Sequence, residues 1–514
     1  MKDIRFTIIF ALILSLFSCE QSKELAEKVL DIPPEARAPI RLTPTEMRWA
    51  TQDLVDIYHE KSNVTLWNAN KKREELLEAL ITAENDGLRP DSYPIPELFN
   101  YHLGYYSLNA NKRTEADLLY TQTFLKLAKH LATGRLNPKK LYGDWEYYKK
   151  DIDYQSLLTD ALAEKSVKET LAEITPQNKY YIGLKEAYAD YKQKISKDTV
   201  RPIRASEQEK VAYQLALLGD YARNDKQEIS SEELSKAIAN FQKRNELSPS
   251  GRLDESTLKA LNLPIVELTK KIIVNLERAR WIPNDLGDKY VLVNIPEAHL
   301  YLVNDGEIIE EHTVIVGTAE RRTPVLSSQF SQLVINPTWT VPPTILKNDL
   351  TPKASQDSTY FARNNMLIYN NKGEQINPEE WDPEQSKHYR YVQQPGGANS
   401  LGLIKFDFPN QHMVYLHDTN NKALFGRKNR ALSSGCVRVQ DPFDLADNIL
   451  KLENNPKTKE DLLALVEEKK TKFLPLKKQV FVHQLYWTTW KDNQGQLQFR
   501  NDPYDFDAGL YKRL

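Results

Sequence analysis

One cysteine and one histidine occur in a single segment near the end of the chain, YLHDTNNKALFGRKNRALSSGCVRVQDP. Cys436 follows the small residues Ser434 and Gly435, and His417 precedes it at the end of a predicted strand. A thiolate can attack a carbonyl carbon, an imidazole can take the thiol proton, and backbone N–H groups can stabilise the resulting oxyanion. Gly435 permits a tight turn that exposes such N–H groups. These residues predict acyl transfer with Cys436 as the nucleophile and His417 as the base.

The neighbours of Cys436 argue against the usual fate of a free cysteine, which is burial as a small apolar side chain. Ser433, Ser434, Gly435 and Arg438 are poor partners for an apolar core. Arg438, like any nearby protonated histidine, is expected to favour the thiolate electrostatically. We therefore expect a reactive thiol at this position.

The N-terminal segment MKDIRFTIIFALILSLFSCEQ has the layout of a secretory signal, residues 1–18. Lys2 and Arg5 precede an apolar run that is too short to span a bilayer permanently, and Cys19 follows it. The ending LFSC resembles a bacterial lipobox, which implies that Cys19 starts the mature chain and carries lipid. The alternative is an ordinary signal peptide that happens to contain Cys19. Residues 19–41 are predicted to be a tether from the membrane.

The cysteine count supports the nucleophile prediction. The chain has two cysteines, so Cys436 is the only thiol left once Cys19 is lipidated or removed. Exported proteins usually pair their cysteines or lack them, which makes a single retained thiol unusual. The expected location is the periplasm or cell envelope, with the lipid on Cys19 as the membrane anchor.

Length and charge narrow the class of protein. A chain of 514 residues with 40% hydrophobic residues is too long for one core and predicts two to four domains. Its 69 Lys and Arg residues balance 71 Asp and Glu residues, for a formal net charge of −2. Without a long block of positive charge, nucleic acid is not an expected partner.

Helical periodicity dominates the first half of the chain. Residues 42–205 are rich in helix formers with apolar residues three and four positions apart, which predicts an α-helical scaffold without a catalytic cluster. Residues 206–266 predict a smaller helical module, with Ser230 or Ser231 capping one helix and a second helix starting near Asp254. The wording AIANFQKRNELSPSGRLDESTLKALN resembles the peptidoglycan-binding module, which has three helices.

After Pro264 the pattern is predicted to change from helix to strand. KYVLVNIPEAHLYLVNDGEII alternates apolar and polar residues around two turns, which predicts a β-meander, and HTVIVG, QLVINPTW, HMVYLHDT and KQVFVHQLYWTTW are further candidate strands. Residues 267–514 are thus expected to form a β-rich domain. Residues 341–395 interrupt it with charged, helix-permissive sequence, and an insertion of that length is usually a lid or functional loop.

The segment YLHDTNNKALFGRKNRALSSGCVRV resembles the active-site motif of the L,D-transpeptidases, the cysteine enzymes of the bacterial wall with the ErfK/YbiS/YcfS/YnhG catalytic domain. The order of signal, helical scaffold, binding module and catalytic domain is similar to the large periplasmic branch of that family. The resemblance implies an α+β multidomain protein that needs no cofactor. It implies a nucleophile at Cys436, a general base at His417, and an oxyanion hole from the amides of Ser434, Gly435 and Cys436. It also places Tyr415, Trp339 and Arg438 beside the substrate cleft.

The motif departs from many members of that family at one position. Many L,D-transpeptidases read HGC before the nucleophile, whereas Ser434 occupies the histidine position here, as is common in the large branch. A second histidine cannot then orient His417. A backbone carbonyl or the Ser433 hydroxyl is expected to fix its tautomer instead.

The other histidines are predicted to be structural. His412 precedes His417 by five positions, and in an alternating strand the two would lie on opposite faces. His299, His312, His388 and His483 have no Cys or carboxylate at ligand spacing, so a metal site is not expected.

The predicted reaction is a cross-link between the third residues of two stem peptides, made through a thioester on Cys436 from a tetrapeptide donor. The expected partners are peptidoglycan stem peptides and glycan, the membrane through the N-terminal lipid, and enzymes of wall synthesis. Three alternatives stay open: hydrolysis by the same site as an L,D-carboxypeptidase, attachment of a protein to the wall, and a non-enzymatic wall-binding lipoprotein.

Overall fold

The computed structural model describes residues 38–48, 50–146, 150–163, 165–222 and 229–514. The signal and lipidation predictions for residues 1–18 and Cys19 lie outside the described residues, as does most of the predicted tether. Within the described ranges, no helix combines the length and apolar character that a bilayer-spanning segment needs. The chain divides into two compact units, one ending at Thr175 and interrupted by residues 134–149, the other comprising those residues and Pro176–Leu514.

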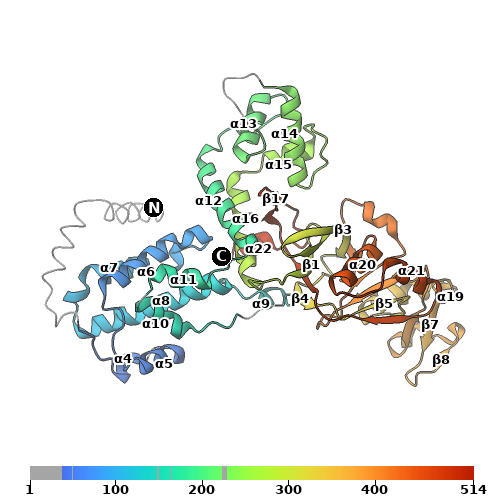
Figure 1. The fold of residues 1–514 in the computed structure, drawn as a ribbon, viewed down its shortest axis with the longest axis horizontal. Coiled ribbons are helices and arrows are strands. Elements are labelled where there is room, and N and C mark those ends of the chain that lie inside the picture. The colour runs from blue at the N-terminus through green and yellow to red at the C-terminus, as the bar shows by residue number, and fades with distance from the viewer. Residues whose placement is uncertain (1–37, 49, 147–149, 164, 223–228) are drawn as a thin grey trace. The chain divides into compact units, whose positions relative to one another are not determined.

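The first unit is all helical, as predicted (Figure 1). Its helices are α4 (Pro44–Met47), α5 (Gln52–Glu60), α6 (Asn70–Thr82), α7 (Ile95–Gly104), α8 (Ala110–Thr133), α10 (Tyr154–Leu162) and α11 (Val167–Ile174). Helix α11 begins at a capping box, in which the Ser166 hydroxyl accepts from the Glu169 amide and the Glu169 carboxylate accepts from the Ser166 amide. The long helix α8 contributes Phe124, Leu127 and Ala128 to the central core.

The second unit begins with helices that include the predicted module. They are α9 (Pro138–Tyr142), α12 (Lys179–Lys194), α13 (Gln208–Leu218), α14 (Ser231–Arg244), α15 (Glu255–Leu261) and α16 (Ile265–Trp281). Ser230 caps α14 and Asp254 caps α15, each by accepting from a backbone amide of the first turn, which confirms the predicted helix starts.

The prediction that helix gives way to strand after Pro264 was wrong, because α16 starts at the next residue. Ile265, Leu268, Ile272 and Leu276 recur at helical spacing and pack into the core of the module. Trp281, at the end of the same helix, packs into the core of the sheet that follows. Helix α16 therefore joins the module to the β-rich region.

The β-rich region is built on an eleven-stranded sheet. Its strands are β1 (Lys289–Asn294), β2 (His299–Asn304), β3 (Glu307–Gly317), β4 (Leu326–Gln329), β5 (Gln332–Ile335), β10 (Ile404–Asp407), β11 (Leu416–His417), β12 (Ala431–Ser433), β13 (Val437–Val439), β14 (Lys472–Pro475) and β15 (Phe481–Leu485). They run in the order β14, β5, β10, β11, β13, β3, β2, β1, β15, β4, and β12 pairs with β3.

The first three strands form the predicted meander. Asp305 and Gly306 turn the chain from β2 into β3 with φ of 49° and 85°. Positive φ at both central residues is the condition of a type I′ turn, whose twist matches that of the strands on either side.

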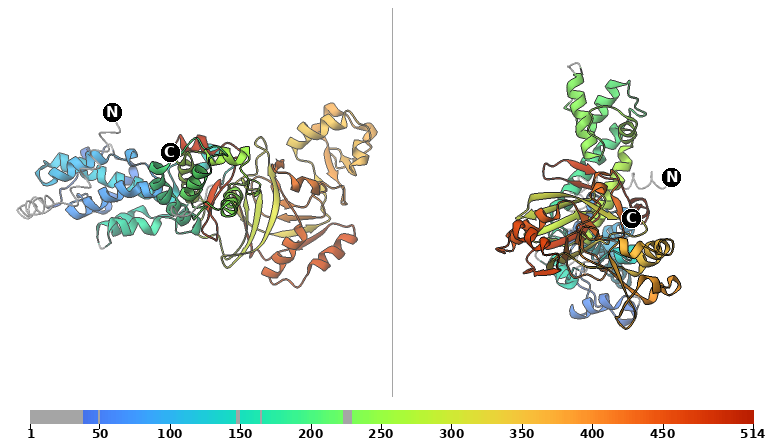
Figure 2. Two further views of the ribbon diagram at one scale, coloured as in Figure 1. Left: turned by 90° about the horizontal axis from the view of Figure 1, so that it is seen from above. Right: turned by 90° about the vertical axis from the view of Figure 1, so that its right-hand side faces the viewer.

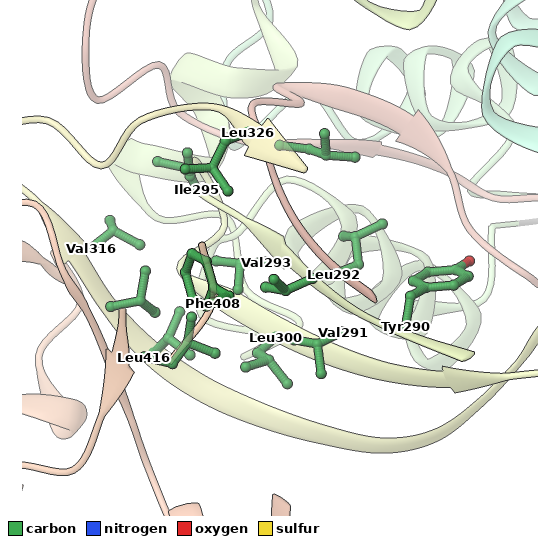
Figure 3. Packing of buried hydrophobic residues seen from close by; sticks show 14 of the residues in the cluster. Tyr290, Val291, Leu292, Val293, Ile295, Leu300, Val316, Leu326, Phe408 and Leu416 are labelled. Atoms are coloured by element: carbon green, nitrogen blue, oxygen red, sulfur yellow. The ribbon is translucent and has the colours of Figure 1, made fainter. Parts of the chain in front are cut away.

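Residues of the sheet, including the consecutive residues 290–293 of β1, form a large apolar core, part of which Figure 3 shows around Leu300, Val316, Phe408 and Leu416. Helices α20 (Pro442–Leu452) and α21 (Lys459–Glu467) contribute to this core through Leu445, Ile449 and Leu462 among others. Because side chains alternate along a strand, burial of Leu416 turns its neighbours Tyr415 and His417 to the opposite face.

The C-terminal segment contributes to both parts of this unit. The stretch KQVFVHQLYWTTW contains two strands in different sheets, β15 and β16 (Thr489–Lys491), and β16 forms a hairpin with β17 (Leu497–Phe499). Leu497 and Phe499 pack in the module core, and α22 (Asp507–Tyr511) follows. The module and the eleven-stranded sheet are therefore joined by packing at α16 and at this hairpin.

Residues 341–395 do not form a simple helical lid. Three short helices, α17 (Pro343–Ile345), α18 (Thr351–Ala354) and α19 (Tyr360–Arg363), accompany the π-helical turn η5 (Leu346–Leu350). A second sheet of order β6 (Trp339–Thr340), β9 (Arg390–Gln393), β7 (Met366–Tyr369) and β8 (Gln375–Ile376) was not predicted. Phe361, Ile368 and Tyr391 lie in a separate small core, so the insertion is a lobe of its own (Figure 2).

Candidate active site

Two neighbouring parallel strands carry most of the predicted site residues. Leu416 of β11 pairs with Val437 of β13, and His417 pairs with Arg438. Leu416 and Val437 are fully buried in the apolar core. Alternation along the two strands therefore places four predicted side chains together on the other face: Tyr415, His417, Cys436 and Arg438.

The thiol of Cys436 lies beside Tyr415. The Tyr415 side chain and backbone both take part in hydrogen bonds with Cys436, and the Tyr415 side chain also bonds with Trp339. The rings of Tyr415 and His417 lie 5.7 Å apart in an edge-on arrangement. Tyr415 thus connects the thiol to the imidazole on its own strand and to the first strand of the inserted lobe.

Burial raises the pKa of the Cys436 thiol. Hydrogen bonds from Tyr415 and the positive charges of Lys405 and Arg438 act in the opposite direction but do not offset the burial. Arg438 therefore favours the thiolate, as expected from the sequence, yet the resting group is a neutral thiol.

His417 is also neutral at rest. Burial, together with the positive charges of Arg438 and Lys405, lowers the pKa of His417 to about 3. Its Nδ1 lies 2.5 Å from the backbone oxygen of Asp418. Since a carbonyl oxygen can only accept, Nδ1 carries the proton and Nε2 keeps its lone pair.

The Ser433 hydroxyl has another role than the one considered for it. It donates to the carbonyl of Cys436 at 2.6 Å and accepts from the amide of Gly435 at 3.1 Å. Of the two groups predicted to orient His417, the backbone carbonyl is the one in contact. Since the Gly435 amide is engaged in this conformation, the amides of Ser434 and Cys436 are the candidate donors for an oxyanion.

The loop that presents Cys436 depends on Gly435. Its φ is +117°, a conformation that side-chain-bearing residues rarely adopt, and a Cβ here would lie 3.3 Å from the backbone oxygen of Arg322. The Gly435 carbonyl accepts from the Thr323 hydroxyl at 2.8 Å, and the same hydroxyl accepts from the amide of Gly317. The loop is thereby held against the segment that follows β3.

Comparison with known proteins identifies this region. Residues 288–473 match the model of the L,D-transpeptidase catalytic domain, and the range contains every residue of the candidate site. Residues 288–473 thus belong to the L,D-transpeptidase catalytic-domain family. Residues 52–187 match a model described as "Scaffold domain", and residues 206–261 match one described as "Putative peptidoglycan binding domain".

A curated protein of Haemophilus influenzae, named "Putative L,D-transpeptidase", is 38% identical over 245 residues, which are 47% of this chain and 49% of that protein. The match thus spans about half the length of this relative. The Ldtfm–avibactam carbamoyl enzyme is 12% identical, with 59% of this chain and 98% of that chain covered and a TM-score of 0.17. A cysteine-to-serine mutant of the Enterococcus faecium L,D-transpeptidase is 11% identical, with 54% and 100% covered and a TM-score of 0.18. These two scores are too low to support an argument.

Lys405 is a component of the candidate site that the motif did not reveal. It pairs with His417 across β10 and β11, which puts both side chains on the site face. Its Nζ lies 4.8 Å from the centre of the Tyr415 ring and 2.9 Å from a carboxylate oxygen of Asp407. The alternation in IKFD places Lys405 and Asp407 on one face, but only the pairing of β10 with β11 links that face to His417.

Asp418 is a second residue that sequence reasoning missed. Its carboxylate accepts from the amide of Leu403 at 2.9 Å and contacts Lys422. Its backbone amide donates to Ile404 at 2.9 Å. These bonds fix the segment whose carbonyl contacts His417, so Asp418 positions the imidazole through its backbone.

His412 lies outside the candidate site, although the reason given from the sequence is wrong. It precedes β11 in a turn, so strand alternation does not apply to it. Its Nε2 lies 3.7 Å from a carboxylate oxygen of Glu146. This ion-pair distance agrees with the structural role that was predicted for it.

Proposed function

We propose that this protein is a cysteine-dependent L,D-transpeptidase that joins the third residues of two peptidoglycan stem peptides. One observation carries the proposal: a half-buried thiol, a neutral imidazole, a tyrosine and an arginine share one face of two adjacent strands. The match of this region to the transpeptidase catalytic domain supports the same reaction.

In the first step, the Cys436 sulfur attacks the carbonyl carbon of the third residue of a tetrapeptide donor. Because thiol and imidazole are both neutral at rest, the thiol proton passes to Nε2 of His417 as the sulfur–carbon bond forms. The tetrahedral intermediate then expels the terminal D-Ala, whose nitrogen takes the proton from His417. A thioester on Cys436 remains.

In the second step, the side-chain amine of the third residue of another stem attacks this thioester. His417 accepts a proton from the attacking nitrogen, the carbon–sulfur bond breaks, and the sulfur takes the proton back. The amide product links the two third residues. Water in place of the amine would give a tripeptide, and an amine of an envelope protein would give a protein attached to the wall.

Charge around the thiol supports a substrate that carries carboxylates. Arg438 has a buried Nε without a hydrogen-bond partner among the described residues, and Lys405 lies on the same face. The terminal D-Ala of a tetrapeptide ends in a carboxylate that these cations would attract. They would also stabilise the oxyanion that forms next to the Ser434 and Cys436 amides.

The inserted lobe is proposed to act as a cap over the bound stems. Trp339 begins the first strand of the lobe's sheet and forms a hydrogen bond with Tyr415. Movement of the lobe would therefore shift Tyr415, which lies beside the thiol. A cap that excludes water would favour the amine over water as the acceptor. Shortening residues 341–395 should therefore slow cross-linking more than it slows labelling of Cys436 by a small electrophile.

The remaining parts fit an exported wall enzyme. We propose that residues 206–261 hold the enzyme on peptidoglycan, that the chain is exported, and that lipid on Cys19 anchors it in the envelope. Cys19→Ala should then leave the catalytic part folded and release it from membranes. Retention of that variant in washed membranes would remove the lipid anchor from the proposal.

The reaction is tested by intact-mass analysis of purified protein incubated with tetrapeptide or pentapeptide fragments. The proposal predicts an adduct on Cys436 that lacks the terminal D-Ala, formed from the tetrapeptide, followed by a dimer linked through the two third residues. An adduct formed from the pentapeptide alone would assign the site to a different donor. Release of tripeptide without dimer would favour the carboxypeptidase.

A further inference from the structure

A pocket of about 600 Å³ lies where the helical module meets the catalytic sheet. Its walls come from Glu246 in the segment after α14, the turn between β1 and β2, the loop after β3, the segment before β12 and the segment after β17. Ile295, Ala298 and Val316 give it a buried apolar base. A concave site with an apolar base and several polar groups is the usual form of a ligand site.

The polar groups of the pocket carry both signs of charge. Lys428 and Arg430 come from the segment before β12, and Glu246 and Glu320 come from the module and from the loop after β3. Two amide side chains, Asn429 and Asn501, also line the pocket and can form hydrogen bonds with a peptide backbone. Such a lining suits a short peptide with carboxylates and a free amine better than an uncharged glycan.

The basic wall is held in place by the catalytic domain. Arg430 donates through Nη2 to the backbone oxygen of Glu297 at 2.9 Å. The Glu297 carboxylate in turn pairs with Arg500 at 2.6 Å and accepts from the Tyr301 hydroxyl at 2.9 Å. Arg430 is therefore fixed before a ligand arrives, which reduces the entropy lost on binding.

The pocket is connected directly to the loop that presents the nucleophile. The amide of Thr318, in one wall, donates to the carbonyl of Ser433 at 3.1 Å, and the amide of Val316 donates to the carbonyl of Arg430 at 3.0 Å. Ser433 precedes Cys436 by three positions, so its backbone lies within about 10 Å of the nucleophile even in a fully extended chain. A bound stem peptide can span that distance.

Acidic residues of the pocket include one beside the basic wall, Glu246, whose pKa burial raises and the positive charges of Arg500 and Arg430 lower. Glu320, two positions after Thr318, is exposed, and hydrogen bonds from the Glu320 amide and the Thr318 hydroxyl lower its pKa. Lys428 and Arg430 lie in the segment that leads to the catalytic loop from the other direction. An ammonium group is attracted to Glu320, and carboxylates are attracted to the basic residues.

We propose that this pocket binds the acceptor stem peptide, with its carboxylates on Lys428 and Arg430 and its side-chain amine directed past Glu320 toward Cys436. The inference rests on the proposed transpeptidation and assigns its second substrate to a site. It also explains why the module and the catalytic sheet share a wall, since a stem held there is presented to the thioester.

The first test measures cross-linking with a fixed tetrapeptide donor and a tripeptide acceptor of varied concentration. Lys428→Glu should raise the acceptor KM about tenfold more than it changes the rate of donor acylation. A change of about tenfold is the size expected for the loss of one charge-assisted hydrogen bond. Arg430→Gln should act in the same direction. Lys243→Glu, an equal charge reversal at an exposed position of α14, is the matched control. An acceptor KM that changes equally in Lys428→Glu and Lys243→Glu would overturn the proposal.

A second test does not depend on turnover. Calorimetry should detect binding of the free tripeptide to full-length Cys436→Ala protein and about tenfold weaker binding when Lys428→Glu is added. Binding of a wall disaccharide without peptide, or tripeptide binding that Lys428→Glu leaves unchanged, would contradict the assignment. If the wild type makes no adduct with any donor while tripeptide binding depends on Lys428, the proposed reaction is contradicted and the assignment of a peptide site to this pocket is supported.

Discussion

The two faces of β11 and β13 differ sharply, although the same few residues build both. Leu416 and Val437 point to one face and are fully buried among apolar side chains. Tyr415, His417 and Cys436 alternate with them, and the half-buried Cys436 thiol lies near charged and polar groups while it also packs against the same apolar core. Strand periodicity thus separates the residues that stabilise the fold from those that do chemistry.

This separation has an electrostatic consequence. Burial disfavours the charged form of His417, so its pKa falls and it stays neutral. The same burial keeps Cys436 protonated. A neutral pair is poised for proton transfer during attack, unlike a preformed thiolate and imidazolium pair.

The largest effect is expected on the site face. His417→Ala should slow acylation of Cys436 by about 10²- to 10⁴-fold, because the base that takes the thiol proton is lost. His417→Gln, which fills more of the same space, should be similarly slow and should retain the wild-type melting temperature more closely. The exposed His59→Ala is the control. Wild-type acylation rates in both His417 variants would exclude this residue as the base.

A change on the core face should act on stability instead. Leu416→Ala removes a fully buried side chain and should lower the free energy of unfolding by about 2–5 kcal/mol, measured by denaturant titration. Leu463→Ala, at a side chain 41% exposed, should cost much less. A Leu416→Ala protein that is as stable as the wild type but does not acylate Cys436 would contradict the assignment of stability to one face and chemistry to the other.

Gly435 is expected to affect both the stability of the fold and the position of Cys436. Gly435→Ala forces a side chain into a backbone conformation of φ +117° and should cost about 1–3 kcal/mol of stability, with loss of acylation as Cys436 is displaced. Gly426→Ala is a matched control, because a Cβ there meets no atom within 4 Å. Equal melting temperatures for the two variants would show that the loop tolerates another conformation.

The smallest effect concerns Lys405. With His417 neutral above about pH 3 and the pKa of Cys436 raised, acylation should be nearly independent of pH between 5 and 8. The charge of Lys405 lowers both pKa values, so Lys405→Met should raise both and slow acylation by less than about tenfold. The acid limb of the profile should move to higher pH. Lys457→Met, at an exposed site, should leave the profile unchanged.

Much of this arrangement could be predicted from short-range patterns. Alternation in KYVLVN and the turn NDG predicted the meander, and the SSGC motif pointed to Cys436. Helix α16 was not predicted, although its apolar residues recur at regular helical spacing, because the alternating pattern of the strands that follow was assigned to the whole region after Pro264. Contacts between residues distant in the sequence could not be predicted, because no local sequence pattern indicates that Lys405 pairs with His417 or that Leu497 packs in the module.

The pKa values of the site were also beyond sequence reasoning. A nearby arginine favours a thiolate, and Arg438 does act in that direction. How much burial opposes it depends on the core assembled from distant strands and helices, which the motif does not contain.

In the proposed reaction Cys436 carries the acyl group, and a comparison of the wild type with Cys436→Ala shows whether it does. Wild-type and Cys436→Ala proteins are incubated with tetrapeptide fragments, and both the protein mass and the peptide products are measured. The substitution barely changes the volume of the side chain, so both proteins should fold alike by circular dichroism. We expect an adduct and a dimer joined through the two third residues from the wild type, and neither from Cys436→Ala. A dimer made by Cys436→Ala would contradict the account.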